Sequence, residues 1–148
     1  MLTVYNTMSR KKEEFHPLRA GEISIYCCGV TPYNDPHIGN ARPFVTWDVV
    51  RRYLEKRGYA VRYVQNFTDI DDKIIRRAVQ NGETLSSLTG RFIAAMHEDE
   101  AALGIQRPDL EPRATDYVPQ MLDLVVLLER NGYAYRSGDG DTLFRVRR

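Results

Sequence analysis

The sequence predicts an α/β fold built on a parallel β-sheet, and three observations support this prediction. Residues 22–28, EISIYCC, alternate apolar and polar side chains as a half-buried strand does. Residues 39–57 have a helical pattern that stops before Gly58, and residues 59–67, YAVRYVQNF, have the composition of a second strand. Because short connections join strand, helix and strand, the two strands should be parallel neighbours with a right-handed crossover.

Bulk properties describe an ordinary globular domain. The chain has 148 residues, of which 43% are hydrophobic and 28% are charged, enough for a real core. Its formal charge of +1 gives no support for nucleic-acid binding. No apolar run approaches the roughly 20 residues of a membrane span, and the first 15 residues lack the apolar block of a signal peptide. We therefore expect no membrane association.

The only two cysteines, Cys27 and Cys28, are adjacent. Their Cα atoms are about 3.8 Å apart across a trans peptide, which is too close for an ordinary disulfide. This favours a reduced, cytoplasmic protein. Strand alternation predicts that Cys27 shares the face of Ile23 and that Cys28 points the other way.

The other elements follow in order along the chain. Val4 and Tyr5 open a short extended piece, and residues 10–15 look like a solvated turn. Val45, Val49, Tyr53 and Leu54 form the predicted apolar stripe of the first helix. Further predictions are a helix over 68–82 capped by Thr68, a helix over 84–103 with Leu85, Leu88, Phe92 and Met96 on one face, a loop over 107–115, a helix over 115–129, and a hairpin over 133–148. The last strand has no further sheet to join, which indicates part of a larger protein.

Candidate binding residues gather where the first strand ends. Ligands of doubly wound folds bind at the carboxyl ends of strands, where Cys28, Gly29, Thr31, His37, Gly39 and Asn40 fall. The helix that begins near Gly39 offers unpaired amides and a positive dipole end to an anion. His37 and Asn40 could donate to the same phosphate chain. Spacing alone favours a simpler alternative, in which the histidine caps the helix and the glycine permits a turn.

Other chemically interesting residues also have simpler interpretations. Cys28 alone looks like a small buried apolar residue, since no cysteine or histidine pair has zinc-finger spacing. Asp69, Asp71 and Asp72 are expected in the first turn of a helix, where carboxylates are favoured. His16 and His97 have no identifiable partners. The basic clusters are expected to be solvated faces: Arg51, Arg52, Lys56 and Arg57; Arg76 and Arg77; Arg145, Arg147 and Arg148.

Two stretches, CCGVTPYNDPHIGNAR and YVQNFTDIDDKIIRRA, resemble the bacterial cysteinyl-tRNA synthetases, and the similarity extends over essentially the whole chain. Residues 37–40 correspond to the His-Ile-Gly-His signature of class I synthetases. The resemblance implies the first half of a Rossmann-like parallel sheet followed by helices. It assigns residues 1–115 to the N-terminal half of the catalytic domain and residues 116–148 to the start of a connective insertion.

The resemblance also implies a reaction and the residues that perform it. The family activates L-cysteine with ATP and Mg²⁺ to cysteinyl-adenylate, and then esterifies tRNA(Cys). Cys28 would be one of four ligands of a zinc ion that binds the substrate thiolate, which a serine hydroxyl could not match. Gly29, Thr31, Asn66 and Thr68 would line the substrate pocket. His37 and Asn40, with Gly39 between them, would hold the ATP phosphates and stabilise transition-state charge.

This sequence departs from the family pattern at several points. Pro32 and Asn34 replace the commoner valine and aspartate, and Asn40 replaces the second histidine. The other zinc ligands and the Lys-Met-Ser-Lys-Ser loop do not occur in these residues, so we expect the 148-residue chain alone to be inactive and to bind zinc poorly, although Cys28 is present. Two alternatives are the cysteine ligase of mycothiol biosynthesis, which often carries Thr-Pro-Tyr, and a noncatalytic nucleotide- or RNA-binding module.

Overall fold

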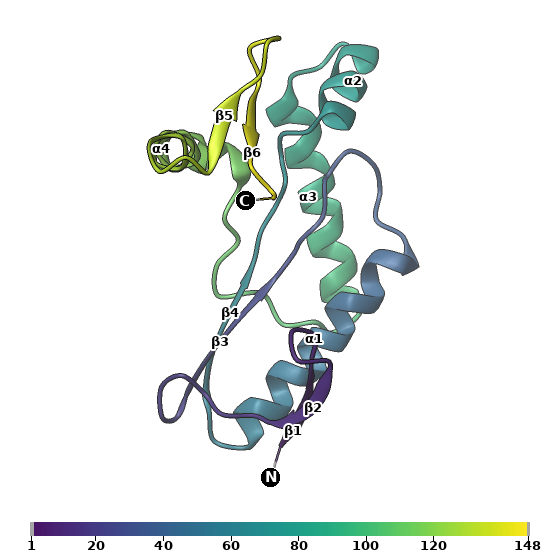
Figure 1. Cartoon of the computed structure of the whole chain (residues 1–148). Coiled ribbons are helices and arrows are strands. Elements are labelled where there is room, and N and C mark those ends of the chain that lie inside the picture. The colour runs from purple at the N-terminus through teal and green to yellow at the C-terminus, as the bar shows by residue number, and fades with distance from the viewer. Residues whose placement is uncertain (1, 148) are drawn as a thin grey trace.

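The computed structural model of the chain describes residues 2–147. A parallel pair of strands forms its centre, with an antiparallel hairpin near each terminus (Figure 1). The elements are β1 (Thr3–Asn6), β2 (Lys11–Glu14), β3 (Glu22–Cys27), α1 (Ile38–Lys56), β4 (Ala60–Gln65), α2 (Asp72–Asn81), α3 (Leu85–Ala102), the 3₁₀ turn η1 (Ala114–Tyr117), α4 (Val118–Arg130), β5 (Ala134–Arg136) and β6 (Thr142–Phe144).

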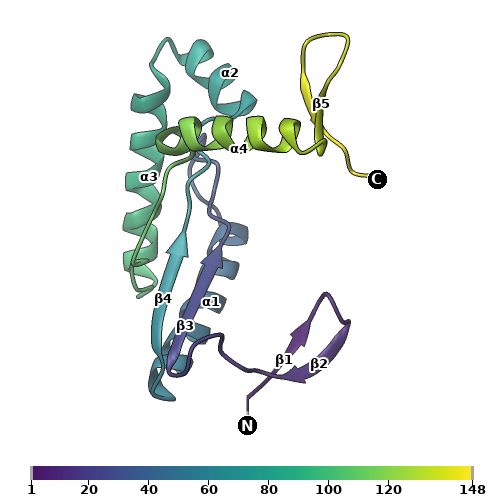
Figure 2. The same ribbon diagram turned by 60° about the vertical axis from the view of Figure 1, so that its left-hand side comes forward.

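The predicted strand–helix–strand unit is confirmed. β3 pairs with β4 in parallel, from Glu22 opposite Ala60 to Cys27 opposite Gln65, and α1 connects them. Figure 2 shows the two strands pointing the same way with α1 behind them. Both strands therefore end at the same edge, which brings the loop after Cys27 beside the loop after Gln65.

The segment predicted as a loop over 107–115 lies along β4 as an irregular third strand. The amide of Gln65 donates to the carbonyl of Leu110 at 3.0 Å, and the amide of Phe67 donates to the carbonyl of Pro112 at 2.9 Å. Isolated parallel bridges join Val64 to Leu110 and Phe67 to Arg113. Prolines on both sides of Leu110 prevent a regular ladder, but the remaining amides still satisfy this edge of β4.

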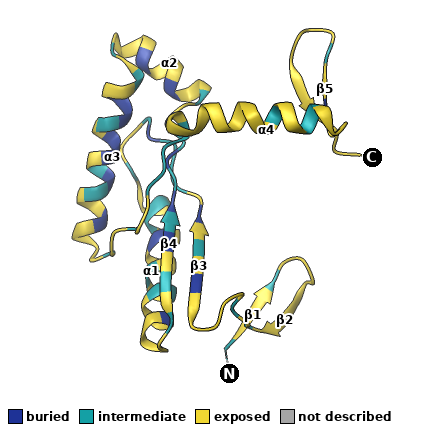
Figure 3. Ribbon diagram, turned by 90° about the vertical axis from the view of Figure 1, so that its left-hand side faces the viewer, coloured by how far each residue is buried: buried dark blue, intermediate teal, exposed yellow. Residues whose placement is uncertain are grey.

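The core lies between the parallel strands and the helices α1 and α3. One buried cluster contains Phe44, Phe67, Ile93 and Met96, and another contains Ile74, Ala78, Leu88 and Phe92. The predicted apolar face of the 84–103 helix is confirmed, because Leu88, Phe92 and Met96 are buried. Figure 3 shows these buried positions on the inner side of α3, whereas α4 has no buried residue.

The predicted apolar stripe of the first helix is only partly correct. Leu54 is buried, but Val49 is 60% exposed and Tyr53 is 44% exposed. Phe44, which the prediction left out, is the other buried residue of α1. The helix therefore turns a narrower face to the core than the apolar residues suggest.

Two sequence predictions about turns and caps are wrong. Residues 11–14, expected in a solvated turn, form β2 and pair with β1. The helix expected to start at Thr68 begins at Asp72, and Asp71 caps it by accepting a hydrogen bond from the Lys73 amide at 2.8 Å. Asp69 lies outside this helix and is buried. It accepts from the Thr115 amide at 3.0 Å and the Thr115 hydroxyl at 2.6 Å, which ties the end of β4 to η1.

The basic cluster of α1 is a solvated face at Arg52, Lys56 and Arg57, as predicted, but not at Arg51. The Arg51 side chain is only 11% exposed and pairs with Asp109 at 3.1 Å. It also donates to the Arg107 carbonyl at 2.8 Å, while Arg52 donates to the Gly104 carbonyl at 2.8 Å. These contacts fasten α1 to the segment that follows α3, and the sequence separation of more than 50 residues hides them from a local pattern.

The hairpin predicted at the C-terminal end is confirmed as an antiparallel pair of β5 and β6. Together with α4, it extends away from the parallel strands (Figure 2). The predicted division of the chain at residue 115 stays a prediction.

A buried polar network lies beneath β4. The Tyr63 hydroxyl donates to Gln65 Oε1 at 2.9 Å, and Gln65 Nε2 donates to Glu100 Oε1 at 3.4 Å. Glu100 is 4% exposed, and burial raises the pKa of its carboxyl, with the nearby Glu111 adding to the shift. The ionised form of this carboxyl is therefore disfavoured in the folded chain.

We predict that Glu100→Gln stabilises the chain at neutral and alkaline pH when no metal ion is bound to it. The folded-state pKa of Glu100 lies above its ordinary value of 4.5. Glu100 therefore contributes to the folding stability of wild type in acid, and this contribution is lost as pH rises through the raised pKa. Glutamine does not titrate. Chemical unfolding in the presence of a chelator should show an advantage of the variant that grows with pH. An equal advantage at pH 4 and pH 8 would contradict the prediction.

Candidate functional site

The predicted site residues lie around the carboxyl ends of β3 and β4. The loop 28–37 leaves β3 there and returns to the N-terminus of α1 (Figure 1). The amide of Gly29 donates to the side-chain Oδ1 of Asn66 at 2.9 Å, and the amide of Thr68 donates to the carbonyl of Val30 at 3.1 Å. These two hydrogen bonds join the strand ends and set the position of the whole loop.

Gly29 is required by the close approach of the two strand ends. A Cβ atom at this position would lie 1.6 Å from the backbone oxygen of Asn66. No side-chain rotation relieves a clash with a backbone carbonyl. The sequence prediction placed Gly29 in a substrate pocket, and the structure adds a packing reason for the same residue.

The two thiols occupy opposite faces, as alternation predicted. Cys27 is buried and Cys28 is exposed. Burial raises the pKa of the Cys27 thiol, which disfavours the thiolate that a metal requires. The interpretation of Cys28 as a buried core residue is therefore wrong, because its side chain faces solvent at the end of β3.

His37 and Asn40 form a reciprocal cap on α1. The Gly39 amide donates to Nδ1 of His37 at 3.1 Å, and the His37 amide donates to Oδ1 of Asn40 at 3.1 Å. The capping alternative raised by the sequence is thus observed. Neither His37 Nε2 nor Asn40 Nδ2 makes a hydrogen bond within residues 2–147, so each group remains available to a ligand.

A cavity of about 310 Å³ brings four of the predicted residues together. Its lining includes Gly29, Thr31, His37 and Asn40. The sequence analysis missed Lys73, which also lines it and lies 5.7 Å from the centre of the Tyr33 ring. Lys73 places a cation at the edge of this cavity. No local pattern could have identified Lys73, because it joins this lining only where the first turn of α2 lies near the loop 28–37.

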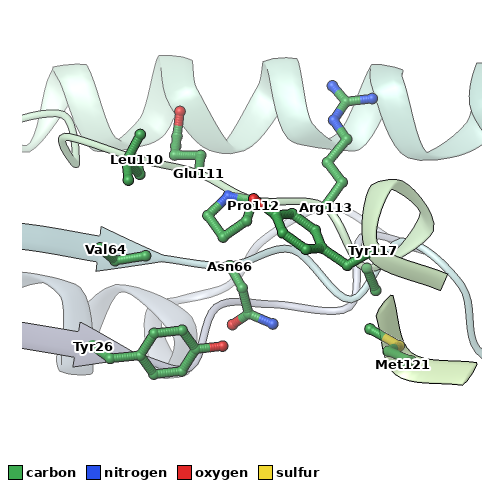
Figure 4. Close-up of a pocket in the computed structure, with 10 residues that line it drawn as sticks. Tyr26, Val64, Asn66, Leu110, Glu111, Pro112, Arg113, Tyr117 and Met121 are labelled. Atoms are coloured by element: carbon green, nitrogen blue, oxygen red, sulfur yellow. The ribbon is translucent and has the colours of Figure 1, made fainter. Parts of the chain in front are cut away.

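A second cavity, of about 550 Å³, opens on the other side of the strand ends (Figure 4). Asn66 lines its middle, with Tyr26 and Val64 of the strands on one side and Tyr117 and Met121 on the other. The side chain of Asn66 thus accepts the hydrogen bond from the Gly29 amide and also lines this cavity. Thr68, predicted as a pocket residue, lines neither cavity.

A family model described as tRNA synthetases class I (C) catalytic domain matches residues 14–148. The Cysteine--tRNA ligase of Burkholderia cenocepacia strain J2315 is 59% identical over 147 residues, which are 99% of this chain and 32% of that protein. The ligase of the same name from Burkholderia ambifaria strain AMMD is 60% identical over the same shares. The chain therefore spans about a third of the length of these curated relatives.

Solved structures share the fold at low identity. Mycobacterium tuberculosis methionyl-tRNA synthetase in complex with methionyl-adenylate has a TM-score of 0.67 at 22% identity, covering 77% of this chain and 22% of that one. The LeuRS–tRNA–LeuAMS ternary complex of Agrobacterium radiobacter K84 has a TM-score of 0.66 at 22% identity, covering 82% of this chain and 16% of that one. Within residues 2–147, no helix is both long and apolar enough to cross a membrane.

Proposed function

The chain belongs to the class I tRNA synthetase catalytic-domain family, and from this premise we propose that it is the N-terminal part of a cysteine–tRNA ligase. The observation that carries the proposal is the 59–60% identity to proteins of that name over 99% of the chain. These relatives favour the ligase over the mycothiol-pathway enzyme and over a noncatalytic module. Its substrates would be L-cysteine, ATP with Mg²⁺, and tRNA(Cys), in the cytoplasm.

In the first step, a carboxylate oxygen of cysteine attacks the α-phosphorus of ATP and pyrophosphate leaves. Charge develops on the phosphate oxygens, so the protein needs hydrogen-bond donors more than a general base. His37, Asn40 and Lys73 surround the cavity where the phosphates would lie. We assign these three residues to the binding of the phosphate chain.

The hydrogen bonds of the α1 cap orient two of these donors, His37 and Asn40. Because His37 Nδ1 accepts from the Gly39 amide, the proton of the neutral ring must be on Nε2. Because Asn40 Oδ1 accepts from the His37 amide, the Nδ2 group is left to donate outward. The same hydrogen bonds that start the helix thus orient both side chains as donors, and Asn40 can take the place of a histidine in this role.

Cys28 fits zinc as one ligand of a larger set. Its thiol is exposed at the strand end, but within residues 2–147 no group of three metal-ligating side chains forms around it. The remaining ligands would come from the part of the relatives that this chain does not match. When bound, zinc would supply the soft partner that distinguishes a cysteine thiolate from a serine hydroxyl.

The test is amino-acid-dependent ATP–pyrophosphate exchange in an enzyme of the relatives' full length that carries this chain in the matching place. We expect exchange with cysteine and none above background with serine. The 148-residue chain alone should give no exchange. Exchange that needs another amino acid, or none with the full-length enzyme, would contradict the proposed function.

A further inference from the structure

Three potential metal ligands converge at the outer end of the buried polar network. His97 and Glu100 lie three residues apart on one face of α3, and Glu111 reaches them from the segment beside β4. His97 Nε2 and Glu111 Oε1 are 3.0 Å apart, and one ligand atom of each residue lies within 4.8 Å of the others. The sequence analysis found no partner for His97, because Glu111 joins it only through the path of the chain after α3.

Glu100 provides the second, independent observation. Its Oε2 is the one buried side-chain oxygen or nitrogen within residues 2–147 that has no hydrogen-bond partner. A buried carboxylate oxygen without a donor is costly, and such groups in native proteins usually have a bound ion or water. Glu100 as a whole residue is only 4% exposed, and its other carboxylate oxygen already accepts from Gln65.

No hydrogen bond reaches this oxygen within residues 2–147, although the charge of nearby Arg107 favours the ionised carboxyl. Arg107 pairs with Oε2 of Glu111, and within residues 2–147 no ion pair joins Arg107 to Glu100. Phe67 packs edge-on against the His97 ring at a centroid distance of 5.8 Å, which holds the ring in place. The side chains of His97 and Glu111 are 23% and 17% exposed, so an ion has access from solvent.

We propose that His97 Nε2, Glu100 and Glu111 bind one divalent transition-metal ion. One imidazole nitrogen and two carboxylate oxygens suit zinc and its neighbours in the first row better than magnesium or calcium. Ligand bonds of about 2.0–2.2 Å require neighbouring ligand atoms roughly 3–3.5 Å apart. The 3.0 Å separation of His97 and Glu111 already meets this requirement, and a carboxylate oxygen of Glu100 lies within 4.8 Å of both ligand atoms.

This site is separate from Cys28. Glu100 bonds Gln65, which faces the helices, whereas Cys28 is exposed on the opposite face of the strands. The proposal does not depend on the proposed function, because it concerns metal binding by the chain itself. Zinc held here would be independent of both thiols.

The experiment is equilibrium dialysis of the chelator-treated 148-residue chain against zinc. Wild type should bind about one zinc per chain. His97→Gln and Glu100→Gln should each weaken binding by about 100-fold or more, since even loss of an outer-shell partner costs 10–100-fold. His16→Ala is the matched control and should bind zinc as wild type does, while Cys28→Ser tests whether the thiol that the proposed function assigns to zinc contributes to this site. His16 is an exposed histidine near Glu14, 3.8 Å away, and therefore tests nonspecific imidazole binding.

The absorption spectrum of wild type loaded with Co²⁺ is a second measurement, and it does not depend on whether a variant folds. Wild type loaded with Co²⁺ should show d–d absorption without a thiolate-to-metal charge-transfer band. Circular dichroism identifies any unfolded variant, and Glu100→Gln is expected to be at least as stable as wild type. No zinc bound by wild type, zinc that survives both ligand substitutions, zinc lost in Cys28→Ser, or a thiolate band would each overturn the proposal.

Discussion

Replacing His37 by asparagine should lower cysteine-dependent ATP–pyrophosphate exchange by roughly 10²–10³-fold, the loss typical of one missing transition-state donor. Asparagine is among the best N-cap residues, so the cap of α1 should survive the change. What disappears is the ring and its Nε2–H. The measurement uses the full-length enzyme described above and compares kcat/KM for ATP.

This substitution separates two roles that His37→Ala would confuse. Alanine removes both the cap on the Gly39 amide and the proposed phosphate donor, so a loss of activity could arise from a frayed helix. Asn40→Asp is the companion change, because a carboxylate oxygen still accepts from the His37 amide but nothing is left to donate. Unfolding curves for both variants should overlay that of wild type. Exchange at the wild-type rate in His37→Asn would refute the assignment of His37 to phosphate.

Gly29→Ala should destabilise the chain by about 3 kcal/mol, at the upper end of what overpacking usually costs. The new methyl would meet the carbonyl oxygen of Asn66 at 1.6 Å, so the strand ends must separate. The Gly29–Asn66 hydrogen bond should then be lost together with the shape of the 310 Å³ cavity. Urea unfolding of wild type and variant measures the difference.

Gly90→Ala is the matched control for Gly29→Ala. Gly90 lies inside α3, and beyond its chain neighbours and the adjacent backbone of its own helix a Cβ there would meet no atom within 4 Å. Alanine should therefore stabilise the chain by about 0.5–1 kcal/mol through helix propensity. A Gly29→Ala variant as stable as wild type would show that the strand junction can open at no cost.

Local patterns in the sequence were sufficient for the central unit. The alternation over 22–28 places Cys27 and Cys28 on opposite faces, because side chains of a strand alternate whatever they pack against, but only the structure showed that Cys28 is the exposed one. The helical repeat in α3 likewise identifies Leu88, Phe92 and Met96 as its buried face. The meeting of Gly29 with Asn66 also follows from these patterns, since parallel neighbouring strands end at one edge.

Tertiary structure decided the features that join distant segments. Asp69 could have sat in the first turn of a helix, but Thr115, 46 residues away, offers it two donors. Arg51 could have faced solvent, but Asp109 and the carbonyl of Arg107 hold it against the core edge. Local propensities for a cap or a solvated face are worth about 1 kcal/mol, whereas hydrogen bonds to charged groups contribute about 1.5–3 kcal/mol each, so two of them at one residue outweigh the local preference.

The candidate metal ligands show the same division. The sequence by itself determined that His97 and Glu100 share one face of a helix, because three residues make nearly one turn. Only the tertiary structure brought Glu111 to that face and buried Glu100 without a partner for Oε2. Burial and charge pairing depend on which segments pack together. The path of the chain after α3 is set by hydrogen bonds to β4, and no periodic pattern in the sequence predicts these bonds.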